Sequence, residues 1–153
     1  MTTLRLAELN AAYAAAIDQD RLEAWPDFFT DDCLYKVTSA DNERAGMQAG
    51  IVYADSRAML RDRITALRTA NIYERQAYRH IIGLPLIGAQ SDGFVEAETP
   101  FIIARITRNA RTDLFATGVY RDRVVERGGA LRFQERIVVC DSNHFDTLLA
   151  IPL

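Results

Sequence analysis

The hydrophobic pattern of this 153-residue chain changes its period near Tyr78, and that change limits the folds it can adopt. Before Tyr78, apolar residues recur at helical spacing. After it, they follow four long strand-like segments that are bounded by turn residues, among them the paired glycines Gly128 and Gly129. The pattern therefore predicts an antiparallel, strongly twisted sheet with strands at about 78–88, 94–108, 113–127 and 130–142.

The N-terminal part of the chain carries helix signals. Apolar residues at helical spacing from Leu6 to Ile17 predict a helix over about 3–18, with Thr2 or Thr3 as its N-cap. A second helical stretch is expected to begin near Asp20, where Pro26 must break or restart it. Helices that precede a meander of strands are typical of an α+β fold.

The middle of the chain is predicted to alternate between strand, loop and helix. A short strand is expected at 31–38, a loop at 39–50 and a brief strand at 51–53. A further helix follows, capped by Asp55 or Ser56, with an apolar face of Met59, Leu60, Ile64 and Leu67. We expect the helices to bury their apolar faces on the concave side of the sheet.

Composition fits one globular domain over residues 1–153, since 49% of the residues are apolar and 25% are charged. The net charge is −3, with both signs interspersed, so no basic surface for nucleic acid is indicated. No apolar run reaches the length of a membrane span. We expect a soluble cytoplasmic protein whose apolar last residues, 147–153, dock on another part of the structure.

The two cysteines, Cys33 and Cys140, are expected to be free and buried. They do not form a Rieske motif, in which a histidine follows one cysteine at the second place and the other at the third. Tyr35 and Lys36 stand at those places after Cys33. Ser142 and Asn143 stand there after Cys140. The spacing therefore excludes a Rieske cluster within this chain.

A mononuclear iron site needs two histidines and a carboxylate. His80 and His144, with Asp141 or Asp146, contain the necessary atoms. These residues come from distant segments and lack the spacing of a ligand pair, so the sequence disfavours this site. No glycine-rich phosphate loop, nucleotide fingerprint or nucleophile elbow is present either.

His80 is the first residue that allows a catalytic interpretation. In small cone-shaped α+β folds, a strand histidine and an aspartate such as Asp31 or Asp32 can form a dehydratase or isomerase pair. The alternative is a half-buried strand histidine bonded to a neighbour, with the two aspartates ending a helix and forming a turn. Lone histidines and paired aspartates more often have these structural roles, and the sequence favours them.

Glu135 is the second such residue. Strict alternation places it on the same strand face as Leu131, Phe133, Ile137 and Val139. A carboxylate among apolar side chains needs a partner, because burying an unpaired charge is costly. Ion pairing or a subunit interface is therefore favoured over catalysis. Several arginines on the same strands are candidates for solvated or interface positions: Arg121, Arg123, Arg127, Arg132 and Arg136.

The order and spacing of these segments resemble the small (beta) subunit of aromatic ring-hydroxylating dioxygenases. The match covers nearly the whole chain. It is carried by Trp25-x-x-Phe28-Phe29-x-x-Asp32-Cys33-x-Tyr35, by Tyr53-x-Asp55-x-x-x-Met59-Leu60-x-x-Arg63-Ile64-x-x-Leu67, by Arg79-His80 and by Arg136-Ile137-Val138-Val139-Cys140-Asp141.

This resemblance implies a cone-shaped α+β fold like that of nuclear transport factor 2, with N-terminal helices packed on a curved, mainly antiparallel sheet. It implies a structural subunit with no catalytic, cofactor-binding or metal-binding residue of its own. The Rieske 2Fe-2S cluster and a mononuclear Fe(II) would lie in a large (alpha) subunit, in an assembly of three large and three small subunits. A separate NADH-dependent reductase would supply electrons, and the substrate would be an aromatic carboxylate such as terephthalate.

Two other classes of function stay open on sequence alone. One is a free-standing dehydratase or isomerase that uses His80 with Asp31 or Asp32. The other is a cofactor-free binding module for a small hydrophobic ligand, which would require an open interior in the cone.

Overall fold

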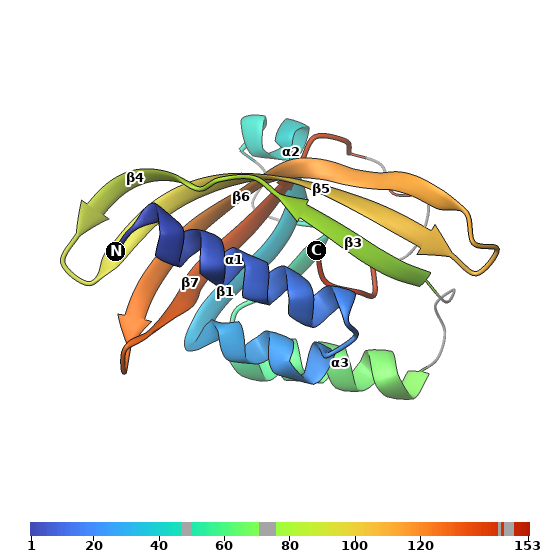
Figure 1. The fold of residues 1–153 in the computed structure, drawn as a ribbon, viewed down its shortest axis with the longest axis horizontal. Coiled ribbons are helices and arrows are strands. Elements are labelled where there is room, and N and C mark those ends of the chain that lie inside the picture. Colours follow the sequence, from blue (N-terminus) through green and yellow to red (C-terminus); the bar gives the residue numbers. More distant parts are fainter. Residues whose placement is uncertain (47–49, 71–75, 144, 146–148) are drawn as a thin grey trace.

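The computed structural model describes residues 1–46, 50–70, 76–143, 145 and 149–153. Helical elements come first in the chain and long strands dominate its second half (Figure 1). The helical elements are α1 (Thr3–Asp18), the 3-10 helix η1 (Leu22–Phe28), α2 (Ala40–Arg44) and α3 (Arg57–Ala70). The strands are β1 (Phe29–Ser39), β2 (Val52–Ala54), β3 (Gln76–Ile82), β4 (Leu86–Ser91), β5 (Phe94–Thr107), β6 (Thr112–Arg127) and β7 (Ala130–Cys140).

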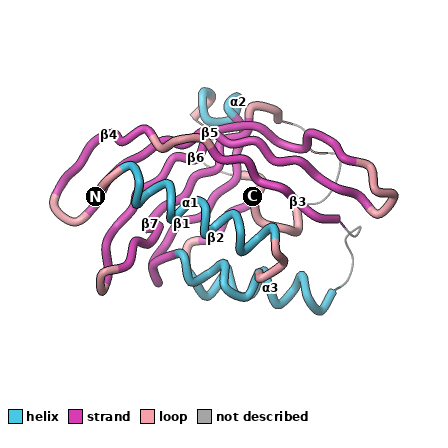
Figure 2. Tube along the Cα trace, viewed as in Figure 1, coloured by secondary structure: helices cyan, strands magenta, loops and turns pink. Residues whose placement is uncertain are grey.

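These strands form one curled sheet in the order β2-β1-β7-β6-β5-β3, and β4 also pairs with β5. The pairings are antiparallel except that β1 runs parallel to β7. In Figures 1 and 2 the sheet arches over α1 and α3, which lie on its concave side. The predicted α+β class and the helices on a curved, mainly antiparallel sheet are confirmed.

The predicted boundary of α1 is confirmed at both ends. The Thr2 hydroxyl accepts a hydrogen bond from the Arg5 backbone N–H at 3.2 Å, which caps the free end of the helix. The residues that face the sheet include Leu6, Tyr13 and Ile17, all buried at helical spacing. One face of α1 is therefore buried and the other is exposed.

The helix α3 resembles α1 in having a capping hydroxyl at its N-terminus and one buried face. The Ser56 hydroxyl accepts from the Met59 N–H at 3.2 Å, as the sequence predicts for its N-terminus. Leu60, Ile64 and Leu67 form the buried face, whereas Met59, predicted to share it, is 39% exposed. None of the helices in the described part of the chain is long and apolar enough to cross a membrane.

The segment predicted as one strand at 78–88 is interrupted. It forms β3 and β4, which pair with successive parts of the same edge of β5. Between them, the Gly83 N–H donates to the Pro100 carbonyl at 2.9 Å, and a Cβ at Gly83 would meet the Pro100 ring at 2.8 Å. Pro85 has no N–H to donate, so the ladder is interrupted there and resumes where Leu86 pairs with Glu98. The predicted loop at 39–50 contains the short helix α2.

A β-bulge in β7 changes which residues face the core. Arg123 pairs with Glu135 and the next residue of β6, Val124, pairs with Phe133, so Gln134 is an extra residue in β7. Phe133 and Arg136 therefore share the buried face, although they are three positions apart in sequence. The predicted placement of Glu135 on the face of Phe133 is wrong, because the bulge reverses the alternation.

Candidate functional site

The interior of the cone, where a protein of this shape would hold a ligand, contains the fully buried Arg136 of β7. Its guanidinium carbon lies 3.8 Å from the ring centroid of Phe133, 4.0 Å from that of Tyr120 and 4.4 Å from that of Tyr13. Aromatic faces attract a desolvated cation, so this packing offsets part of the cost of burying the charge.

Asp122 of β6 neutralises Arg136. The Arg136 Nε donates to Oδ1 of Asp122 at 2.8 Å, and Nη2 donates to Oδ2 at 2.7 Å. The same Nη2 donates to Oδ1 of Asn10 on α1. Burial raises the pKa of the Asp122 carboxyl, and the guanidinium of Arg136 offsets part of that rise. This cluster ties α1, β6 and β7 together and is closed to solvent.

Residues 149–153 close the cone beside this cluster. The carbonyl of Leu153 accepts hydrogen bonds from the hydroxyls of Tyr13 at 2.7 Å and Tyr35 at 3.4 Å. Leu149, Ile151 and Leu153 are buried, which confirms the predicted docking of the described part of the apolar tail. Burial raises the pKa of Tyr35 well above its ordinary value.

The space that remains in this region is small. A cavity of about 10 Å³ lies between residues of β1, β2 and α3 and the docked tail, about enough for one water molecule. Tyr35, which lines this cavity, packs edge to face with Trp25 and Phe29, and the ring centroids of the three residues are 5.1 to 5.9 Å apart. Among the described residues, the docked tail and the aromatic rings fill this part of the cone, which argues against a binding module for a small hydrophobe at this place.

His80 of β3 is bonded to Asp18, the last residue of α1. Its ring Nδ1 lies 2.6 Å from Oδ1 of Asp18, and its backbone N–H donates to Oδ2 at 2.8 Å. Both side chains are buried, and Nε2 of His80 has no hydrogen-bond partner in the described part of the chain. A histidine held by a carboxylate is the arrangement of a general base.

This pair lies beside a groove of about 470 Å³ between α1 and β3. The groove is lined mainly by small or apolar side chains, and Arg79 at its rim has Nη1 3.9 Å from Oδ2 of Asp18. The arrangement has a carboxylate, an imidazole and a cation, which are enough for acid–base chemistry. The buried position of His80 limits the access of a substrate to them.

The predicted partners of His80 are elsewhere. The side chain of Asp31 is 90% exposed, and its Oδ1 lies 2.8 Å from Nη1 of Arg57 on α3. Asp32 is exposed as well. The structure therefore supports the predicted bond between His80 and a neighbour, and Asp18 replaces Asp31 or Asp32 as its partner.

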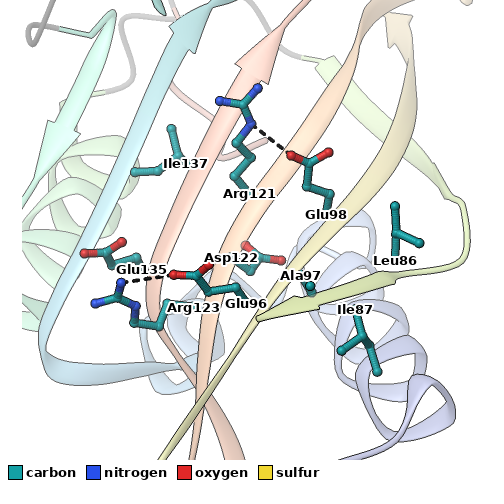
Figure 3. Close-up of a pocket in the computed structure, with 11 residues that line it drawn as sticks. Leu86, Ile87, Glu96, Ala97, Glu98, Arg121, Asp122, Arg123, Glu135 and Ile137 are labelled. Atoms are coloured by element: carbon teal, nitrogen blue, oxygen red, sulfur yellow. Dashed lines mark hydrogen bonds and ion pairs between the residues drawn. The ribbon is translucent and has the colours of Figure 1, made fainter. Parts of the chain in front are cut away.

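Glu135 lies on the outer, convex face of the sheet, in a groove that β4, β5, β6 and β7 line (Figure 3). Arg123 is its register partner on β6, but Arg123 is bonded to Glu96 at 3.2 Å. Glu135 has no ion pair within the described ranges. A second dashed line in Figure 3 joins Arg121 and Glu98, where Nε of Arg121 lies 3.3 Å from Oε2 of Glu98.

Cys33 and Cys140 are free and buried, as predicted. Burial raises the pKa of the Cys33 thiol to about 11 and that of Cys140 to about 12. Across the described residues, no group of three or more histidine, cysteine, aspartate or glutamate side chains is arranged to hold a metal ion. His144 and Asp146 of the hypothetical iron site lie outside the described residues.

Three polar residues of the buried clusters, Asn10, Asp18 and Asp122, were not predicted, although the sequence contains a signal for each of them. Asn10 interrupts the apolar face of the first helix, and it is 4% exposed in the structure. Asp18 stands at the end of that helix, where the helix dipole disfavours an anion and a compensating partner is required. Asp122 alternates with buried residues of β6, so its side chain must point inward.

A curled sheet that closes over α1 and α3 defines the cone-shaped α+β class typified by nuclear transport factor 2. The same architecture is found in a crystal structure from Novosphingobium aromaticivorans, of a protein assigned as an aromatic-ring-hydroxylating dioxygenase beta subunit. The TM-score is 0.91 at 36% sequence identity, over 99% of this chain and 96% of that one.

Sequence comparison narrows the class to a family. The family model of the ring hydroxylating beta subunit matches residues 12–147. The subunit beta 1 of the terminal oxygenase component of terephthalate 1,2-dioxygenase from Comamonas is 53% identical over 98% of this chain and 97% of that protein. The anthranilate 1,2-dioxygenase small subunit from Burkholderia cepacia is 37% identical over 99% of this chain and 94% of that protein. This chain belongs to the ring-hydroxylating dioxygenase beta-subunit family, as its sequence motifs predict.

Proposed function

We propose that the chain is the structural small subunit of the terminal oxygenase of an aromatic ring-hydroxylating dioxygenase. The observation that carries this proposal is the buried cluster of Arg136 and Asp122, which together with residues 149–153 occupies the part of the cone interior that the structure describes. A subunit whose interior is occupied in this way would stabilise the assembly with a partner subunit. It would have no catalytic, cofactor-binding or metal-binding residue of its own. Residues 1–153 would then act as a single structural domain.

The partner would be the large subunit, which would hold the Rieske 2Fe-2S cluster and the mononuclear Fe(II). Support comes from the relative at 53% identity, which is named as a subunit of a terminal oxygenase component, and from the spacing around Cys33 and Cys140, which is not that of a Rieske motif. Three large and three small subunits would form the oxygenase. A reductase would pass electrons from NADH to the large subunit, so we expect the assembly in the cytoplasm, without nucleic-acid or membrane partners.

The substrate of the assembly would be an aromatic carboxylate such as terephthalate, converted to a cis-dihydrodiol with O2. The relatives at 53% and 37% identity are named for terephthalate and for anthranilate, which are both benzene carboxylates. The small subunit would influence this reaction only by holding the large subunits in place.

The proposal is tested by expressing the chain alone and with a large subunit that carries Cys-x-His and Cys-x-x-His motifs. We expect co-purification in equal amounts and conversion of terephthalate only when large subunit, small subunit and reductase are present. The isolated chain should bind no iron and turn over no aromatic carboxylate. Failure of the two subunits to associate, at micromolar concentration, would contradict the proposal.

A free-standing dehydratase or isomerase is the second candidate, because Asp18 and His80 form a carboxylate–imidazole pair. It requires turnover by the isolated chain on a hydroxylated cyclic substrate. His80→Gln and Asp18→Asn would then abolish activity while circular dichroism stays unchanged. If both variants support full activity of the assembled oxygenase, the pair has a structural role and this candidate is rejected.

A further inference from the structure

Residues 149–153, which we call the plug, lie on the concave side of the sheet between α1, β1 and α3. Tyr13 of α1, Tyr35 of β1 and Arg63 of α3 all bond to it. In Figure 1 it runs under the arch of the sheet to the mark C. Its residue Leu153 is 1% exposed. A cavity of about 10 Å³ remains beside the plug, and this cavity holds nothing larger than a water molecule.

The plug is held less firmly than the strands around it. Its residues belong to no helix or strand, and its backbone makes no hydrogen bond to the backbone of another described residue. The bonds that hold its backbone come from side chains, and Pro152 has no N–H to add one. Segments held in this way open locally at a lower free energy than the core of a sheet. The plug can therefore undock while the sheet stays intact.

Three donors lose their acceptors when the plug undocks. The hydroxyls of Tyr13 and Tyr35 donate to the carbonyl of Leu153 at 2.7 Å and 3.4 Å. Burial raises the pKa of both phenols, so they keep their protons at neutral pH and stay donors. Nη2 of Arg63 donates to the carbonyl of Leu149 at 3.1 Å, and Arg63 makes no ion pair with any described residue. Donors without acceptors are unfavourable in a buried place, so the opened interior favours an anionic oxygen ligand.

The surroundings of these donors are aromatic. Tyr35 packs edge to face with Trp25 at 5.1 Å between ring centroids, and Tyr13 packs in the same way with Phe133 at 5.6 Å. A further aromatic ring packs well against such edges and faces. In a ligand that consists of a ring and a carboxylate, the ring replaces the side chain of Leu153 and the carboxylate replaces its carbonyl.

We propose that the part of the cone interior occupied by the plug is a binding site for an aromatic carboxylate, which the docked plug keeps closed. The carboxylate accepts hydrogen bonds from Tyr13, Tyr35 and Arg63, and the ring lies among the aromatic side chains. Ligand and plug compete for the same donors, so the ligand binds only the fraction of molecules in which the plug is undocked. The inference goes beyond the proposed structural role and does not depend on it.

A full-length chain with a weakened plug tests the inference. The triple variant Leu149→Ala, Ile151→Ala and Leu153→Ala removes apolar contacts of the plug and keeps its backbone. Benzoate should bind this variant about tenfold or more tightly than it binds the original chain, because a larger fraction is open. Toluene has the ring without the carboxylate and should bind the variant about tenfold more weakly than benzoate does. Isothermal titration calorimetry measures both ligands.

A matched control replaces the same residue types on the outside of the molecule. Leu4, Ile81 and Leu114 are 68%, 60% and 68% exposed, and their triple replacement by alanine should leave benzoate binding unchanged. Circular dichroism shows whether each variant is folded. If the plug triple variant is not, the single variant Leu153→Ala takes its place, because it keeps the other two apolar contacts.

Two further measurements separate the proposed site from an unspecific cavity. Adding Tyr13→Phe to the weakened plug should lower benzoate affinity about tenfold and leave toluene affinity unchanged, since one donor is lost. Benzoate at a saturating concentration should also speed hydrogen exchange of the Leu153 N–H, which bonds to the Tyr35 hydroxyl at 3.2 Å in the docked plug.

The inference is overturned if the weakened plug leaves benzoate affinity unchanged, or if toluene binds as tightly as benzoate. It is also overturned if Tyr13→Phe has no effect, or if saturating benzoate leaves exchange in the plug unchanged or slower. The proposed function is tested separately by co-purification of the unaltered chain with a large subunit, so either idea can fail while the other stands.

Discussion

The two faces of β6 carry the same kind of ion pair in opposite surroundings. On the inner face, Asp122 and Arg136 are 2% and 0% exposed and lie among aromatic rings. On the outer face, Arg123 and Glu96 are 36% and 47% exposed. Consecutive residues of one strand therefore place an aspartate in the core and an arginine in solvent.

The difference in exposure between the two ion pairs of β6 indicates which of them is needed for the fold. A buried ion pair costs several kcal/mol when one partner is removed, because the other charge remains without water. An exposed pair contributes about 0–1 kcal/mol, and salt screens it. The inner pair of β6 is thus a structural requirement, and the outer pairs are free to be exchanged for contacts with another chain.

Removing the inner cation should have the largest effect. Arg136→Met leaves the Asp122 carboxylate buried and unpaired, and we expect a loss of about 3–5 kcal/mol in the free energy of unfolding. Urea denaturation followed by circular dichroism measures it. The double variant Arg136→Met with Asp122→Leu should recover most of the loss, because it removes both charges. A loss below about 1 kcal/mol in Arg136→Met would contradict the distinction between the two faces.

The thiol of Cys140, also on the inner face of β7, should make stability fall in alkali. Its pKa is raised from 9.0 to about 12 by burial, so the folded chain keeps a proton that the unfolded chain releases. The contribution is fully present below pH 9 and is lost as pH rises toward 12, by up to about 1.4 kcal/mol per pH unit. Cys140→Ala should remove this slope, giving a difference of about 2 kcal/mol between pH 8.5 and pH 10.5. Equal slopes in both proteins would show that the thiol is solvated.

Neutralising the outer arginine should have the smallest effect on the isolated chain. Arg123→Gln removes a partly exposed pair, and we expect a change of less than about 1 kcal/mol in the free energy of unfolding. The change should vanish at 1 M salt, where such pairs are screened. Urea titrations at low and high salt check both statements. A loss as large as that of Arg136→Met would show that the two faces are equivalent.

Much of the fold follows from local patterns in the sequence. The first helix and the helix after Ser56 begin where their capping residues predict, because a cap and an apolar stripe are both local signals. The hairpins from β5 to β7 follow from their turn residues. The parallel pairing of β1 with β7 has no local signal, since the partners are about a hundred residues apart in sequence.

The candidate site was less predictable than the fold, because its residues are also brought together by features that have no local signal in the sequence. The extra residue Gln134 reverses the alternation of β7, and nothing in the neighbouring residues marks it as a bulge. Glu135 was therefore expected on the inner face, which Arg136 occupies instead. In the same way, Asp18 and His80 are 62 positions apart in sequence, and only the folded chain shows that they form a hydrogen bond.

The hydrogen bond from Tyr13 to Leu153 joins residues that are 140 positions apart. The cone therefore closes only after almost the entire chain has been synthesised. At a ribosomal rate of about 5–20 residues per second, α1 waits roughly ten seconds or longer for the strands and the tail that cover it. During that interval its apolar face is exposed, so folding in the cell should be slow and should benefit from a chaperone that shields the first helix. The Tyr13–Leu153 contact therefore cannot form before residue 153 has been added to the chain.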